Sequence, residues 1–166
     1  MALGGGCEIS LHADKVVAHA ELYMGLVEFG VGLIPGGGGT KGFAKRLSED
    51  LHAGDIKINR LRDRFLTVGQ AKVSLSAYEA FDYGYLREGI DEVVVSRAHH
   101  LTRAKAACLE MANKGYVPPK REKNITVVGQ EGLGIVYVGA NSMLSGKYMS
   151  EHDKIIAEKL GFVLCG

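Results

Sequence analysis

Glycine is concentrated in two clusters, at residues 4–6 and 36–39, in a chain of 166 residues that contains 23 glycines in all. That content is about twice the usual share of ~7%. Because glycine lacks a Cβ atom, such clusters let the backbone turn tightly and approach another group closely. The first cluster precedes a short helical pattern and leaves free N–H groups at the positive end of that helix. The second predicts a tight turn that opens another helix.

The length fits about one ordinary domain with a single sizeable core. Twenty basic and nineteen acidic residues give a net charge of +1, which argues against general electrostatic binding to nucleic acid or to an anionic membrane. Three scattered cysteines form no C-x-x-C motif, so the sequence disfavours a disulfide framework and favours a reducing compartment. With no signal peptide or membrane-spanning stretch in view, we expect a cytoplasmic protein without membrane insertion.

Short strand patterns alternate with helical ones, which predicts an α/β fold rich in helix. Predicted strands cover residues 15–18, 22–24 and 92–95. Predicted helices cover residues 7–13, 39–47, 51–68, 76–84, 101–115, 131–145 and 150–164. Prolines and charges near residues 115–124 indicate a linker.

Glu8 follows the first glycine cluster directly and lies at the head of the predicted helix. A carboxylate there would sit next to the free N–H groups of the turn. The alternative is a flexible N-terminal tail, in which Glu8 only favours the helix dipole. The residues alone leave both possibilities open.

Glu28 lies in an otherwise apolar, glycine-bounded stretch at residues 25–30. A carboxylate in such surroundings is costly to bury unless it is partnered or functional. The alternative is that Glu28 reaches the surface or pairs with a nearby lysine. Two acids in apolar, glycine-rich settings suit general acid–base chemistry, because neighbouring carboxylates can have separated pKa values.

Other chemistry-bearing patterns are weak. Residues 36–39 are followed by Thr40 and then Lys41, which reverses the order of a phosphate-binding loop. His12, Asp14 and His19 have the spacing of ordinary surface residues, so no metal site is expected. A basic run at residues 57–64 indicates a solvated helix face that could meet an anion.

Residues 2–8 (ALGGGCE) and 25–40 (GLVEFGVGLIPGGGGT) together resemble the enoyl-CoA hydratase/isomerase (crotonase) family. The resemblance covers residues 1 to about 114. It implies the C-terminal half of a crotonase-like ββα spiral over residues 1–114, a linker over 115–124 and a helical, truncated extension over 125–166.

In that family, two glutamates flank a water molecule. The resemblance implies that Glu8 is the base that activates this water and that Glu28 supplies a proton to the α-carbon of a 2-enoyl-CoA thioester. It also implies that the amide N–H of Gly5 is one of two oxyanion donors. Water would add in the syn sense. The CoA thioester is the substrate, and no cofactor is expected within this chain.

Residues 24–28, the four-glycine run and the tail at 126–153 are more similar to long bacterial β-oxidation proteins that also carry a 3-hydroxyacyl-CoA dehydrogenase. NAD would be needed only where such a domain is fused upstream. The family's second oxyanion donor and much of its CoA surface lie in an N-terminal half that is not in these 166 residues. We therefore expect a C-terminal fragment that hydrates enoyl-CoA negligibly alone and belongs to a homo-oligomer. The alternatives are a double-bond isomerase or a non-catalytic assembly module.

Overall fold

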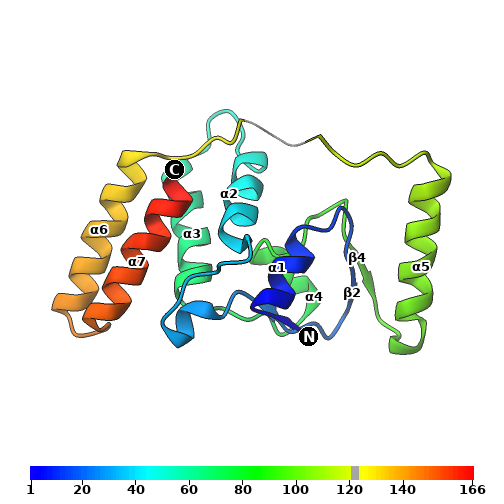
Figure 1. Ribbon diagram of the computed structural model, residues 1–166, viewed down its shortest axis with the longest axis horizontal. Helices are drawn as coiled ribbons and strands as arrows, with labels where there is room; N and C mark the ends of the chain where they lie inside the picture. Colours follow the sequence, from blue (N-terminus) through cyan, green and yellow to red (C-terminus); the bar gives the residue numbers. More distant parts are fainter. Residues whose placement is uncertain (121–123) are drawn as a thin grey trace.

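A computed structural model describes residues 1–120 and 124–166 of the chain. The elements follow in the order β1 (Ala2–Leu3), α1 (Gly5–Leu11), β2 (Val17–His19), β3 (Met24–Gly25), a 3-10 helix η1 (Glu28–Val31), α2 (Gly39–Glu49), α3 (Lys57–Gly69), α4 (Ala77–Asp82), β4 (Glu92–Val94), α5 (Arg97–Asn113), α6 (Gln130–Ser145) and α7 (Glu151–Cys165). The described part is a helix-rich α/β structure, as the alternation of strand and helix patterns predicted (Figure 1).

Two pairs of short parallel strands lie near the centre of the molecule. Strand β1 pairs with β3, with Ala2 opposite Met24, and β2 pairs with β4. Beyond the β1–β3 pair, the Gly4 N–H donates to the Gly25 carbonyl at 2.9 Å. The alternative of a flexible N-terminal tail is therefore excluded, because Ala2 and Leu3 are held in a sheet. This pairing places the start of α1 beside the segment that leads into Glu28.

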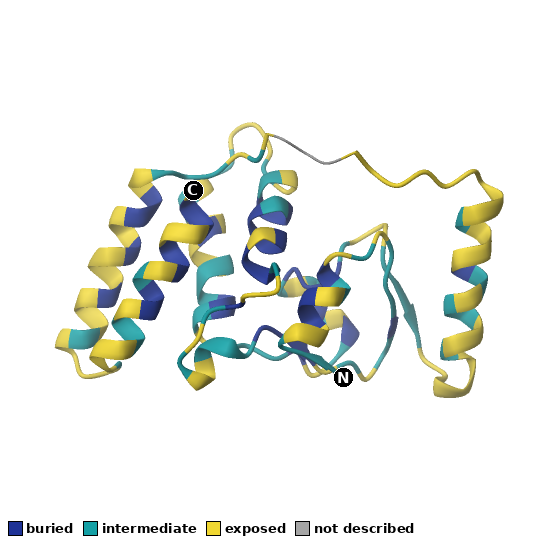
Figure 2. Ribbon diagram, viewed as in Figure 1, coloured by how far each residue is buried: buried dark blue, intermediate teal, exposed yellow. Residues whose placement is uncertain are grey.

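The helices cover the strands unevenly. The hairpin of α6 and α7 packs through α7 against α2 and α3, whereas α5 packs against β2 and β4 on the other side (Figure 1). The buried faces of α2, α6 and α7 point toward one another (Figure 2). The largest fully buried side chains include Tyr85, Phe43, Met24, Leu26 and Leu160.

The buried tyrosine supports the backbone near the glutamates. The Tyr85 hydroxyl donates to the Lys72 carbonyl at 2.8 Å and accepts from the Leu26 N–H at 3.3 Å. Strand β3 is pressed against the same segment, since a Cβ atom at Gly25 would lie 2.4 Å from the Lys72 carbonyl oxygen. Only glycine fits at position 25, which explains the glycine at the start of the apolar stretch at residues 25–30.

Most predicted helices are confirmed with shifted ends. The first helix begins at Gly5 instead of residue 7. The prediction of helix over residues 51–68 was wrong at its start, because Gly54 takes a φ of +96° and α3 begins only at Lys57. Each strand is shorter than predicted or displaced by one or two residues.

Two helix starts are fixed by serine caps. The Ser76 hydroxyl accepts from the Glu79 N–H at the start of α4, and Ser150 forms a reciprocal capping box with Asp153 at the start of α7. Residues 115–120 of the predicted linker contain no helix or strand, and residues 121–123 lie outside the described part. The three-part division of the chain stays a prediction. None of the helices that the structure describes is long and apolar enough to cross a membrane.

Candidate active site

Glu8 is buried in the first turn of α1, where only 6% of the residue is exposed. Its Oε1 atom accepts hydrogen bonds from the N–H groups of Gly37 and Gly39, both at 2.8 Å. Hydrogen bonds from backbone amides to a carboxylate are charge-assisted and strong. The second glycine cluster therefore holds the Glu8 carboxylate in one place.

The four-glycine run is explained by this contact. A Cβ atom at Gly37 would lie 2.4 Å from Glu8 Oε2, and one at Gly39 would lie 2.8 Å from Leu26 Cδ2. Gly38 takes a φ of +102°, and a Cβ atom there would lie 2.8 Å from His12 Cε1. The tight turn predicted here is confirmed, and its amide groups at Gly37 and Gly39 bind the protein's own carboxylate.

Glu28 is the first residue of η1 and is partly buried. Its Oε2 atom is enclosed and has no hydrogen-bond partner among residues 1–120 and 124–166. Burial raises the pKa of the Glu28 carboxyl above its usual value; its own N–H group and that of Val27 oppose the shift, and the charge of Glu8 adds to it. Among residues 1–120 and 124–166, the structure thus differs from the alternative in which Glu28 pairs with a lysine.

Both glutamates lie near the head of α1. Gly4, the N-cap of α1, has a φ of +53°, and a Cβ atom there would lie 3.4 Å from Glu28 Oε1. Glu8 is only four residues further along, on the same helix. A Cβ atom at Gly5 would meet nothing within 4 Å outside its own helix and neighbours. The Gly5 N–H, at the first position of α1, is one of the N–H groups that have no acceptor within the helix.

Cys7 directly precedes Glu8 on α1 and is fully buried. Burial raises the pKa of its thiol to about 12, the charge of Glu28 adds to the shift, and Arg46 opposes it. A thiol in this state is a packed apolar residue and not a nucleophile. Of the predicted site residues, the structure brings Glu8, Glu28 and Gly5 together. Their chemical roles stay predictions.

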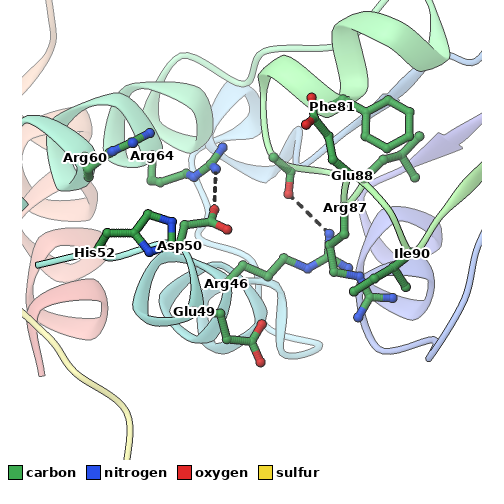
Figure 3. Close-up of a pocket in the computed structure, with 12 residues that line it drawn as sticks. Arg46, Glu49, Asp50, His52, Arg60, Arg64, Phe81, Arg87, Glu88 and Ile90 are labelled. Carbon is green, nitrogen blue, oxygen red and sulfur yellow. Dashed lines mark hydrogen bonds and ion pairs between the residues drawn. The ribbon is translucent and has the colours of Figure 1, made fainter. Parts of the chain in front are cut away.

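A separate cavity of about 500 Å³ is lined by four arginines, at positions 46, 60, 64 and 87 (Figure 3). Arg46 is 5% exposed and donates to the carbonyls of Leu11, Gly84 and Tyr85. Burial lowers the pKa of Arg46 to about 10, which still leaves it charged at neutral pH.

Arg64 in this cavity donates to the Tyr83 carbonyl and points toward Asp50, with which it forms an ion pair at 3.0 Å (Figure 3). The helix face at residues 57–64 is therefore only partly solvated. Arg46 and Arg64 connect α2, α3 and the segment after α4, so we assign both to structural support. Sequence reasoning could not find Arg46, because its three acceptors are backbone carbonyls 35 to 39 positions away.

Several curated proteins are similar to the chain in sequence. No protein-family model matches it. It is 42% identical over all 166 residues to a "Probable 3-hydroxyacyl-CoA dehydrogenase" of Bacillus subtilis, of which it covers 20%. Over 114 residues, 69% of the chain, it is 35% identical to a "Putative fatty acid oxidation complex trifunctional enzyme" of Rickettsia felis, of which it covers 14%.

Shorter stretches match hydratases. Over 51 residues, 31% of the chain, it is 45% identical to the human mitochondrial methylglutaconyl-CoA hydratase, of which it covers 15%. A solved enoyl-CoA hydratase subunit from Geobacillus kaustophilus aligns with 98% of the chain and 50% of its own, at 21% identity and a TM-score of 0.48. The chain thus spans a fifth or less of the length of these curated relatives.

Proposed function

We propose that the chain belongs to the enoyl-CoA hydratase/isomerase (crotonase) family, as its similarity to a hydratase over 51 residues supports, and that it carries the acid–base half of a site that adds water to a 2-enoyl-CoA thioester. The observation that carries this proposal is the pair of carboxyl groups at the head of α1. Glu8 accepts two backbone hydrogen bonds, which suit an ionised carboxylate. Glu28 is held where burial favours its protonated form. One base and one acid are the two groups that hydration requires.

In the proposed reaction, Glu8 removes a proton from water while the water oxygen bonds to C3 of the enoyl group. The electron pair of the C2–C3 double bond moves toward the thioester carbonyl, which becomes an enolate. The Gly5 N–H donates to this oxygen, and Glu28 delivers its proton to C2. Both carboxyl groups return to their starting states after the proton on Glu8 passes back to Glu28 through solvent.

We also propose that the protein is multifunctional. The relative that matches the whole chain is named as a probable 3-hydroxyacyl-CoA dehydrogenase and is much longer than these 166 residues. Hydration yields a 3-hydroxyacyl-CoA, which is the substrate class of such a dehydrogenase. NAD would bind to that other part of the protein. We further propose that the protein is a cytoplasmic homo-oligomer that acts in fatty-acid β-oxidation.

The test is a spectrophotometric assay that follows the loss of the conjugated enoyl thioester. In the protein expressed from its own gene, Glu8→Gln and Glu28→Gln should each lower kcat by about 10²–10⁴-fold, with substrate binding largely kept. Glu21→Gln, which changes an exposed glutamate between the two, should leave kcat within twofold. Near-normal turnover in either of the first two variants would refute the role given to that residue.

Two other outcomes identify the alternatives. Conversion of a 3-enoyl-CoA to its 2-enoyl isomer, without hydration, would show a double-bond isomerase. Oligomer assembly by the protein, without turnover of either substrate, would show a non-catalytic assembly module.

We propose in addition that the 166-residue chain alone hydrates enoyl-CoA negligibly. Its site offers Gly5 as one oxyanion donor, and the resemblance requires a second one. Loss of a single donor costs on the order of 10²–10³ in turnover. Turnover by the purified chain comparable to that of an ordinary hydratase would overturn this expectation.

A further inference from the structure

The C-terminal hairpin of α6 and α7 has no part in the site as described so far. Helix α7 packs against α2 and α3 (Figure 1), and its first turn contacts the residue that ends η1, the short helix that begins with Glu28. The hairpin therefore contacts the segment that follows Glu28, although it contributes no residue to the candidate site. One side chain on α7 makes that connection.

His152, at the second position of α7, contacts the loop after Glu28. Its Nε2 atom lies 2.9 Å from the carbonyl oxygen of Gly32, the C-cap residue of η1. Because the acceptor is a carbonyl, Nε2 is the ring nitrogen that carries the proton and donates. Gly32 has a φ of +78°, and a Cβ atom there would lie 3.1 Å from His152 Nε2. Glycine at this position permits the ring to approach the backbone.

Gly32 and Glu28 are the two ends of one hydrogen-bonded unit. The Gly32 N–H donates to the Phe29 carbonyl at 3.1 Å, and the Leu33 N–H donates to the Glu28 carbonyl at 3.1 Å. A shift of the Gly32 carbonyl is therefore transmitted through a single helical turn to Glu28. The His152 contact restrains the whole turn from its far end.

The position of His152 is itself fixed. Ser150 and Asp153 form a capping box around it, so the first turn of α7 is well defined. Helix α7 packs on α2, and α2 begins at Gly39, whose N–H donates to Glu8. One helix thus contacts both the element that holds Glu8 and the loop that carries Glu28.

We propose that His152 is a positioning residue, which sets the place of Glu28 relative to Glu8 by donating a hydrogen bond to the Gly32 carbonyl. Its side chain is exposed and bonds to backbone, so it takes no direct part in proton transfer. This inference rests on the proposed function, because Glu28 must be the acid for its position to matter.

The test compares three variants in the protein expressed from its own gene. His152→Ala removes the donor, whereas His152→Gln keeps an N–H group that can reach the same carbonyl. His99→Ala changes an exposed histidine on α5 and is the matched control. We expect His152→Ala to lower kcat for 2-enoyl-CoA hydration about three- to tenfold, the range that loss of one hydrogen bond allows. KM should stay within twofold, because the substrate contacts are unchanged.

The conservative variant shows whether the hydrogen bond to the Gly32 carbonyl is the property of His152 that matters. His152→Gln should restore kcat to within twofold of the unaltered protein, and His99→Ala should leave it unchanged. If His152→Ala keeps full kcat, or if the loss lies wholly in KM, the inference is wrong while the hydratase proposal stands. If Glu8→Gln and Glu28→Gln leave hydration intact, the proposed function fails instead.

Discussion

Replacing Gly37 by alanine tests how the glycine run serves Glu8. The new Cβ atom would lie 2.4 Å from Glu8 Oε2, below the 3.0 Å under which real Cβ contacts essentially never fall, so the carboxylate must rotate away. That rotation breaks the hydrogen bonds from the N–H groups of Gly37 and Gly39. Each is a bond to a charged group, worth about 1.5–3 kcal/mol.

The effect on catalysis follows from this displacement. A base misplaced by about 1 Å can cost about 10²-fold, so Gly37→Ala should lower kcat for 2-enoyl-CoA hydration by that factor. The KM should change less than threefold, because the carboxylate acts on water. A neighbouring residue offers the matched control, since a Cβ atom at Gly36 would meet nothing within 4 Å. Gly36→Ala should keep kcat within twofold.

Steady-state kinetics on purified protein, with circular dichroism to show that both variants fold, is the appropriate assay. Equal losses in Gly36→Ala and Gly37→Ala would show that the run needs glycine for backbone freedom alone. Unchanged kcat in Gly37→Ala would show that the clamped carboxylate is not the base. Either result would refute the reasoning.

Two further predictions concern stability. Burial raises the pKa of Glu28 in the folded state, so ionisation opposes folding and stability is lost as pH rises through that pKa. In urea denaturation, Glu28→Gln should therefore stabilise the fold at pH 8 and not at pH 4. Glu79→Gln should show the opposite pH trend, because hydrogen bonds from the Leu75 N–H and the Tyr83 hydroxyl lower the pKa of the Glu79 carboxyl. Gly25→Ala should lower the free energy of unfolding by ~1–3 kcal/mol or more, because its Cβ atom would lie 2.4 Å from the Lys72 carbonyl oxygen. Gly134→Ala, in open space on α6, should be neutral or raise it by ~0.5–1 kcal/mol. Equal effects of the two substitutions would contradict the close approach of β3 to Lys72.

The helices and the two glutamates could be predicted because their signals are local. The caps at Ser76 and Ser150 act within four residues, and apolar periodicity marks most helix bodies. Glu8 and Glu28 each stand out inside a glycine-rich or apolar stretch of a few residues. Their closeness in space needed the family resemblance, because β1 and β3 are only two residues long and carry too little pattern to predict their pairing.

The contacts that hold the site could not be predicted, because they join distant segments through backbone atoms. Glu8 meets Gly37 across 29 positions, and His152 meets Gly32 across 120 positions. A backbone carbonyl or N–H is present at every residue, so nothing in the sequence marks which one a side chain will find. Helix α3 begins late for a similar reason, since the turn at Gly54 has a φ of +96° that overrides the helical pattern around it.

The central claim is that Glu8 and Glu28 act as one acid–base unit. It is tested most directly by kcat for 2-enoyl-CoA hydration in Glu8→Gln, Glu28→Gln and the double variant. Groups that serve the same step are not additive, because removing one already forfeits the benefit of the other. We predict that each single variant loses about 10²–10⁴-fold and that the double variant is no slower than the slower single one by more than about threefold. A double-variant loss equal to the product of the single losses, or near-normal turnover in either single variant, would contradict the account.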